Sequence, residues 1–290
     1  MIEKSIVVIG STTIDKIVKE NGVSMLKLGG ATTYSGITYS RHGFQTIVVS
    51  NVAEKDLSIF EQLYKERVQV CHRTTGNTTH FVNRITGNSR KQELPKKAGT
   101  IKYNQIRDVL DRVSCLHLGP LHPMDIDIEV INLLNDIKLT VFLDVQGYTR
   151  LVKDNIVQRG VSSQLPDALK VSQVVKANEA ELNSMLDHFK TSLTDLMLSF
   201  EIEEFVVTRG EKGGFVKNIN GHEIKYKATS LKKFDDPTGV GDVFFASYII
   251  CRNLKKMAVI DACAYASKLS AQQVEGRYIL PEELSLSNLK

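Results

Sequence analysis

The sequence predicts an α/β protein with a mostly parallel central sheet, helices on both faces of that sheet, and a small β-hairpin lid. Short β-branched runs alternate with segments of helical periodicity along most of the chain, which is typical of such a sheet. Two turn signals, at residues 21–22 and 87–88, interrupt this alternation with hairpins. No linker divides the chain, so we expect one domain over residues 1–290.

The first strand is expected at 5–9, where a β-branched run ends in a glycine. The polar segment that follows ends at Asp15 and leaves the carboxyl end of this strand, where open α/β sheets usually bind ligands. Asp15 is therefore a candidate for binding substrate hydroxyls, and an ordinary solvated loop aspartate is the alternative. Residues 16–28 then alternate around Asn21-Gly22 and form the first hairpin of the lid.

A diglycine, Gly29-Gly30, follows this hairpin and precedes a helix expected over 33–42. Glycines there would let the backbone approach a ligand closely, although a simple end to the strand explains them almost as well. The second hairpin is expected over 78–95, around Gly87-Asn88. Two hairpins inserted into an α/β alternation suggest a small β layer that can close over a site and exclude water.

The remaining elements continue the alternation of strands and helices. In order they are strand 46–52, helix 56–67, strand 68–73, helix 104–111, strand 115–118, helix 126–136, strand 141–144, strand 170–176, helices within 179–199, strand 205–208, a hairpin about Asn220-Gly221 and helix 258–275. Strands separated by helices imply a mostly parallel sheet, because each return to the sheet needs a crossover.

A glycine-containing loop, residues 235–242, runs directly into an apolar helix and is the strongest functional signal in the chain. Its glycines allow backbone N–H groups to approach an anion, and the helix N-terminus adds partial positive charge. Asp242 is placed to accept a proton from a hydroxyl beside a phosphate. Taken alone, a tight turn with a carboxylate that favours the helix dipole explains the pattern equally well. The apolar run 243–251 favours the functional interpretation, because a buried helix supports a site rigidly.

The composition excludes several classes of function. The 290 residues are 42% hydrophobic and 24% charged, with a formal net charge of +4, as in an ordinary globular protein. Basic residues are scattered among acids, so we expect no nucleic-acid partner. No apolar run reaches about 18 residues and no leader precedes the first strand, so we expect no membrane contact and a cytoplasmic location. The four cysteines have no paired or metal-like spacing, and we expect reduced thiols.

Taken together, the motifs resemble those of the ribokinase-like carbohydrate kinases of the PfkB family, in the same order and over nearly the whole chain. The match rests on residues 236–242 (DPTGVGD), which resemble the family motif DTTGAGD, on the N-x-x-E pair Asn178 and Glu181, on the T-x-G-x-x-G loop of Thr208, Gly210 and Gly213, and on Asp15 with Gly29 and Gly30. No G-x-x-x-x-G-K-[ST] segment occurs, so no P-loop competes with this interpretation.

The resemblance implies a role for each motif. Asp242 would be the catalytic base, and the backbone of Gly239, Val240 and Gly241 would form an anion hole. Asn178 would contact the nucleotide and, with Glu181, hold Mg²⁺ indirectly through water; the alternative is an ordinary helix start, since Asn caps helices and acids favour the first turn. The remaining residues would bind the two substrates: Thr208, Gly210 and Gly213 the ATP, and Asp15, Thr13, Gly29, Gly30 and Tyr34 the acceptor.

Departures from the family pattern bear on the acceptor. Ribokinases have a lysine and an asparagine where this chain has Ala31 and Tyr34, and a further asparagine where it has Thr13. Ribose would lose several hydrogen bonds of about 0.5–1.5 kcal/mol each, so ribose is disfavoured. Tyr34, the segment 143–148 and the short first hairpin are more similar to the inositol-kinase-like branch.

A second departure bears on a cofactor. The resemblance allows a monovalent cation, K⁺, near Asp236. Pro237 stands where the family has a threonine and removes a backbone donor beside this position, which puts the cation site in doubt.

The expected activity is transfer of the γ-phosphoryl group of ATP to a hydroxyl of a small sugar or polyol, with an inositol-like acceptor favoured over ribose. A nucleoside kinase of the same fold is an alternative, in which Tyr34 or Phe81 would stack on a base. A non-catalytic protein that binds a sugar or nucleotide is a second alternative, against which Asp242, Asn178 and Glu181 argue. The lid hairpins are also a candidate for pairing in a homodimer.

Overall fold

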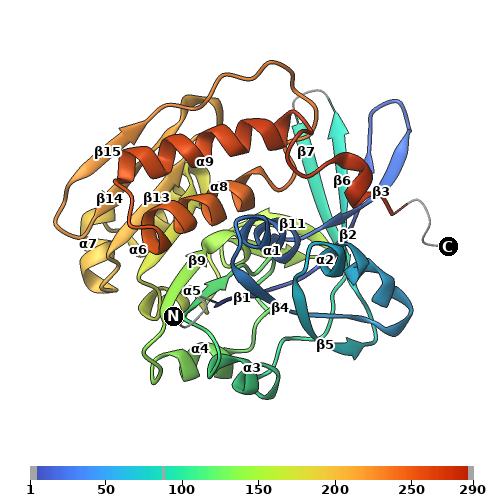
Figure 1. Ribbon diagram of the computed structural model, residues 1–290, viewed down its shortest axis with the longest axis horizontal. Coiled ribbons are helices and arrows are strands. Elements are labelled where there is room, and N and C mark those ends of the chain that lie inside the picture. The colour runs from blue at the N-terminus through green and yellow to red at the C-terminus, as the bar shows by residue number, and fades with distance from the viewer. Residues whose placement is uncertain (1–4, 87–88, 287–290) are drawn as a thin grey trace.

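The computed structural model describes residues 5–86 and 89–286, which form two β-sheets and the helices around the larger one (Figure 1). The larger sheet has nine strands, in the spatial order β15 (Glu223–Tyr226), β14 (Gly214–Asn218), β13 (Glu204–Thr208), β12 (Val174–Asn178), β9 (Thr140–Asp144), β8 (Cys115–Leu118), β1 (Ser5–Ile9), β4 (Gln45–Ala53) and β5 (Gln69–Thr75). All neighbours from β13 to β5 pair in parallel, and only β14 and β15 pair antiparallel. The predicted fold class is confirmed.

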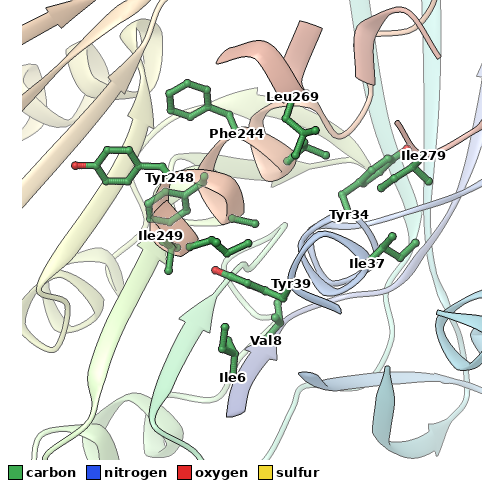
Figure 2. Packing of buried hydrophobic residues seen from close by; sticks show 14 of the residues in the cluster. Ile6, Val8, Tyr34, Ile37, Tyr39, Phe244, Tyr248, Ile249, Leu269 and Ile279 are labelled. Atoms are coloured by element: carbon green, nitrogen blue, oxygen red, sulfur yellow. The ribbon is translucent and has the colours of Figure 1, made fainter. Parts of the chain in front are cut away.

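Helices cover both faces of this sheet, and the side chains of β1 show why. Ile6 and Val8 point into one apolar cluster, whereas Val7 and Ile9 point into another, so the strand is apolar throughout. The first cluster contains side chains from α1 (Ala31–Arg41), α2 (Glu61–Lys65), α8 (Val240–Ile249) and α9 (Val259–Val274), and Figure 2 shows part of it. The second contains side chains from α3 (Tyr103–Leu110), α4 (Ile128–Leu134), α5 (Leu165–Lys170), α6 (Glu179–Phe189) and α7 (Leu193–Ser199).

The smaller sheet, called the second sheet below, contains both predicted hairpins. Its six strands lie in the order β10 (Arg150–Lys153), β11 (Ile156–Arg159), β7 (Ser89–Lys96), β6 (Thr79–Thr86), β2 (Thr13–Val18) and β3 (Ser24–Gly29). In Figure 1, β2, β3, β6 and β7 stand together at the side of the molecule opposite β13 to β15. The predicted turn at residues 87–88 lies outside the described residues.

A third hairpin, β10–β11, belongs to the second sheet and was not predicted. Its turn is formed by Asp154 and Asn155, both in the left-handed region with φ of 50° and 63°. Asp and Asn tolerate this conformation and favour two-residue hairpin turns. This Asp-Asn pair between two short segments that contain apolar residues, 151–153 and 156–157, was therefore an available signal.

Three expectations about local structure were wrong. The strand expected over 170–176 begins only at residue 174, because residues 165–170 form α5, which buries Leu165, Ala168 and Leu169 at helical spacing. The helix expected over 56–67 is a 3₁₀ helix, Glu54–Phe60, followed by the short α2. Asp15 does not lie in a loop, because β2 begins at residue 13 and pairs with β3 and β6.

The remaining short elements are single turns between the larger ones. They are 3₁₀ helices at Val145–Gly147, Gly210–Lys212 and Pro281–Leu284, and a π-helical turn at Ile250–Leu254 that continues α8. Within the described part of the chain, no helix has both the length and the apolar character needed to cross a bilayer.

Candidate active site

Two cavities meet at the loop that precedes α8, where the carboxyl ends of the parallel strands face the second sheet. One, called the apolar cavity below, has a volume of about 280 Å³ and lies between the residues after β13 and helices α8 and α9. The other, called the polar cavity, has a volume of about 130 Å³ and lies between this loop and the second sheet. Pro237 and Gly241 line both cavities, so the loop forms their common wall. Ligands of open α/β sheets bind at this end of the strands.

The loop turns into α8 through a glycine that no other residue could replace without strain. Gly239 has φ of 75°, and a Cβ placed on it would lie 2.2 Å from the ring of Tyr34. The first hydrogen bond within the helix runs from the N–H of Val243 to the carbonyl of Gly239. The amides of Gly241 and Asp242 therefore have no partner within the helix, and they lie at the shared wall with the positive end of the helix dipole.

Asp242 lies in the first turn of α8, half-buried, and lines the polar cavity. Burial, followed by the negative charge of Asp144, raises the pKa of Asp242 to about 7. The positive charges of Lys176 and Arg150 oppose this shift. A carboxylate that titrates near neutral pH is suited to accept a proton from a hydroxyl.

A buried ion pair supports the loop from below. Lys176 of β12 donates to Asp144 at the end of β9, over a distance of 2.8 Å, and both side chains are buried. A Cβ placed on Gly241 would lie 3.1 Å from Nζ of Lys176, so the ammonium lies directly against the loop. Although burial disfavours its charge, the carboxylates of Asp144 and Glu181 keep the pKa of Lys176 above its ordinary value. The ion pair was not predicted as part of the site.

Asp15 reaches the polar cavity from β2, together with the residues that make room for it. Its carboxylate is almost fully buried and accepts a hydrogen bond of 2.7 Å from the hydroxyl of Thr13. A Cβ on Gly29 would lie 2.6 Å from the Asp15 carboxylate, so the first glycine of the diglycine gives Asp15 its position. Gly30 lines the cavity with φ of 98°, whereas Thr13 and Gly29 act through Asp15.

Aromatic residues bound the polar cavity on two sides. Tyr34 of α1 lines it but is 1% exposed, and its ring packs beneath Gly239 within the core shown in Figure 2. Phe81 lies where the pairing of β6 and β7 shifts by one residue, and such bulges redirect a side chain. The guanidinium of Arg150 lies over the Phe81 ring, 5.8 Å from its centroid.

Three further polar side chains line the polar cavity and were missed in the sequence. They are Gln92 of β7, Gln146 of the 3₁₀ turn after β9, and Arg150 at the start of β10. Arg150 also donates to the carbonyl of Leu121 over 3.2 Å. Each comes from a segment that the hairpins and strand ends bring together, so local sequence carried no sign of the cluster.

Asn178 and Glu181 form a reciprocal cap at the start of α6. The Asn178 side chain accepts from the N–H of Glu181 at 2.9 Å, and the Glu181 carboxylate accepts from the N–H of Asn178 at 2.8 Å. Neither residue lines either cavity. The reciprocal cap agrees with the interpretation of these residues as an ordinary helix start.

The chemistry of the carboxylates near the shared wall fits Mg²⁺ held mainly by a substrate. Asp144, Glu181 and Asp242 lie close enough for each to change the pKa of a neighbour. Among the described residues, no group of three His, Cys, Asp or Glu side chains is arranged to enclose a metal ion. Mg²⁺ commonly binds through one or two carboxylates, waters and substrate phosphates rather than in a protein cage. Glu181 fits such an indirect role.

Thr208, Gly210 and Gly213 all line the apolar cavity, at the end of β13 and in the turn that follows. Opposite them, Tyr226 and Phe244 stack at 5.3 Å with their planes 22° apart. Most of the other lining side chains are small or apolar, and include Ala228, Leu231, Phe234, Val240, Ala271 and Val274, whereas Glu211 is charged. No lysine or arginine of the described residues lines this cavity.

Asp236, beside which the family resemblance allows a monovalent cation, is already bonded on both oxygens. Its Oδ2 accepts from Nζ of Lys27 at 2.6 Å. Its Oδ1 accepts from the N–H of Thr238 at 2.8 Å and from the Thr238 hydroxyl at 2.5 Å. The carboxylate therefore has an ammonium partner that belongs to the chain itself.

Comparison with known proteins gives one family and a set of solved structures. The model of one family, described as pfkB family carbohydrate kinase, matches residues 3–279. A pyrophosphate-dependent kinase in the ribokinase family, complexed with a pyrophosphate analog and myo-inositol, matches with a TM-score of 0.79 and 22% identity, over 93% of this chain and 95% of that one.

Two other solved structures show the same fold at lower identity. A nucleoside kinase from Methanocaldococcus jannaschii matches with a TM-score of 0.73 and 16% identity, over 96% of this chain and 95% of that one. Arabidopsis thaliana ribokinase, complexed with ribose and ATP, has the same score and identity, over 98% and 96%. No curated protein sequence matches the chain.

Proposed function

This chain belongs to the pfkB family of carbohydrate kinases, which are phosphotransferases with hydroxyl acceptors, and we propose that it transfers the γ-phosphoryl group of ATP to a small polyol. An inositol-like ring is the favoured acceptor. The observation that carries the proposal is the wall shared by the two cavities, because Gly241 in the first turn of α8 lines both and Asp242 lines the polar one. A donor in the apolar cavity and an acceptor in the polar cavity would meet at this wall.

The polar cavity supports a small, highly hydroxylated acceptor. At about 130 Å³ it is well below the roughly 300–1,000 Å³ typical of sites for drug-sized ligands. Asp15 and Gln146 offer acceptors and donors for ring hydroxyls, and Gln92 reaches the same space from the second sheet. The solved kinase that carries myo-inositol has the same fold as this chain, which agrees with a polyol ring of that size.

Phosphoryl transfer would use the first turn of α8 and the groups around it. Asp242, with its pKa near 7, would accept the proton of the attacking hydroxyl. The amides of Gly241 and Asp242 would stabilise the charge that develops on the transferring group, and Lys176 would add positive charge behind them. Mg²⁺, when bound through the phosphates and held by the Asn178 and Glu181 pair through water, would neutralise further negative charge.

The walls of the apolar cavity favour ATP over pyrophosphate as the donor. A nucleotide base can lie against the stacked Tyr226 and Phe244 and the small side chains of α9. Pyrophosphate would need several cations, yet the lining residues within the described chain include Glu211 and no lysine or arginine. This donor differs from that of the pyrophosphate-dependent kinase, which shares the fold at 22% identity.

The two alternatives find less support. Base stacking in a nucleoside kinase would need an open aromatic face, but Tyr34 is buried beneath Gly239, and Arg150 already lies over Phe81. A non-catalytic binding protein would not need a half-buried carboxylate whose charge is disfavoured at the start of a helix. Sites with strongly shifted pKa values are more often catalytic.

The second sheet is also where we would place contact between two copies of the chain. Val23, Met25 and Leu26 are 40–52% exposed on or beside β3, a concentration of exposed apolar side chains that an interface would cover. Light scattering of the purified chain would test this, because a monomer at all concentrations would remove the proposal.

The function itself is tested by a panel of donors and acceptors. Purified enzyme with Mg²⁺ would be given ATP or pyrophosphate, each with myo-inositol, ribose, hexoses and nucleosides, and phosphorylated products would be separated by mass spectrometry. We expect turnover with ATP and a polyol. Turnover of nucleosides alone would overturn the acceptor, and turnover with pyrophosphate alone would overturn the donor.

A further inference from the structure

A lysine that nothing in the family resemblance accounts for is buried between the second sheet and the loop before α8. Lys27 lies on β3, is 6% exposed, and places Nζ 2.6 Å from Oδ2 of Asp236, which is 209 residues away in the sequence. A buried ammonium is costly unless it is paired and hydrogen-bonded. The burial of Lys27 beside a carboxylate therefore indicates a specific ion pair rather than an ordinary surface lysine.

The pair leaves no place for the monovalent cation that the family resemblance allows near Asp236. Both oxygens of this carboxylate are bonded, to Lys27 and to Thr238. Although burial acts to raise it, the pKa of Asp236 is lowered by Lys27 and Thr238, so the carboxylate stays ionised. A second cation beside the same carboxylate would be repelled by the ammonium.

The Lys27 ammonium can fix the start of the loop before α8. It holds Asp236, and Asp236 in turn holds both the amide and the hydroxyl of Thr238, one residue before Gly239. The loop that forms the shared wall is thus fixed at its beginning by a charge and at its end by α8. A cation bound beside Asp236 would hold the same carboxylate in the same way.

Resting on the proposed kinase function, we propose that the Lys27 ammonium is a built-in substitute for the monovalent cation, so that phosphoryl transfer needs no K⁺. Lys27 is a positioning residue, because it acts on the transferring group through Asp236 and the loop. In the backbone register of β2 and β3, Lys27 lies directly opposite Asp15. The same pair of strands therefore carries the residue proposed to bind the acceptor and the residue that holds the loop.

The first test is chemical rescue. The wild-type enzyme would be compared with Lys27→Ala in buffers that contain only tetramethylammonium, and then with about 0.1 M KCl or NH₄Cl at constant ionic strength. We expect the wild type to respond to neither salt. Lys27→Ala should lose about tenfold to a hundredfold in kcat, with a smaller change in acceptor KM, because a misplaced loop slows the chemical step. K⁺ or NH₄⁺ should restore most of that loss.

Two matched variants separate the charge from the packing of the side chain. Lys27→Met fills the space without charge, and it should be as slow as Lys27→Ala but unresponsive to K⁺. Lys27→Arg keeps the charge and should remain independent of K⁺. Strong activation of the wild type by K⁺, or equal rescue of Lys27→Met and Lys27→Ala, would overturn the proposal.

A second measurement needs no catalytic activity. Thermal melting and hydrogen exchange of residues 235–243 would be followed in the substrate-free protein as KCl replaces tetramethylammonium chloride. K⁺ should raise the melting temperature and slow the exchange of Lys27→Ala alone. If the wild type phosphorylates nothing, the proposed function fails while this measurement still decides the role of Lys27. The absence of any K⁺ effect on folded Lys27→Ala would refute that role.

Discussion

The pH dependence of catalysis should report the electrostatics around Asp242. With a pKa of about 7, only about a tenth of the Asp242 carboxyl is ionised at pH 6. The rate at pH 6 should therefore be about a tenth of its plateau value, whereas a carboxyl with an ordinary pKa would already have reached the plateau. Burial and the charge of Asp144 cause the shift, so removal of that charge should reverse part of it.

The perturbation is Asp144→Asn, which keeps the shape of the side chain. It removes a negative charge beside Asp242 and takes the anionic partner away from the Lys176 ammonium. Both changes favour ionised Asp242. The rising limb of kcat/KM for the acceptor should move to lower pH. Because one partner of a buried ion pair is lost, we also expect a loss of about 3–5 kcal/mol in the free energy of unfolding.

The assay is the pH profile of wild type and variant at saturating donor, below the melting temperature of the variant. The donor phosphate itself titrates near pH 6, so the difference between the two profiles assigns the limb to the enzyme. Asp187→Asn, which removes an exposed carboxylate on α6, is the matched control and should leave the profile unchanged. Superimposable profiles for wild type and Asp144→Asn would refute the reasoning.

Three further substitutions test separate parts of the site. Gly239→Ala would impose a strained φ of 75° and place a Cβ against the Tyr34 ring, so kcat should collapse and unfolding should become easier by more than the roughly 1–2 kcal/mol of the backbone strain alone; unchanged kinetics would show that the turn is not needed. Ala271→Trp should fill the apolar cavity and abolish use of ATP, while pyrophosphate-driven turnover that survives it would place the donor elsewhere. Asp15→Asn should lower kcat/KM for the acceptor by about tenfold to a hundredfold, as expected for the loss of a charged hydrogen bond of about 1.5–3 kcal/mol, and an unaltered acceptor KM would contradict its assignment.

The parts of the site that could be predicted are those formed by one continuous segment of the sequence. The loop 235–242 carries its glycines, its carboxylate and the apolar helix behind it in one segment, so its local structure follows from short-range rules. The alternation of strands and helices likewise sufficed for the fold class. By contrast, α5 was missed and the strand expected over 170–176 began too early, because a short apolar run fits a strand or a helix until its tertiary burial is known.

The parts that could not be predicted depend on which strands become neighbours. Asp144 and Lys176 pair only because β9 and β12 lie side by side, although α5 and the β10–β11 hairpin separate them in the chain. Lys27 of the second sheet meets Asp236 of the loop before α8, 209 residues away in the sequence. Periodicity assigns a residue to a strand, but it does not say which other strand will lie beside it.

Asp242→Asn tests the central claim most directly. Single-turnover phosphoryl transfer should fall by about 10²–10⁴-fold, while calorimetry should show unchanged binding of the donor. The folded-state pKa of Asp242 lies above its unfolded value, so the wild type loses stability as the pH rises from about 4 to about 7, and the Asn variant should melt at or above the wild type at pH 8. A folded variant that transfers the phosphoryl group at the wild-type rate would contradict the assignment of Asp242 as the base.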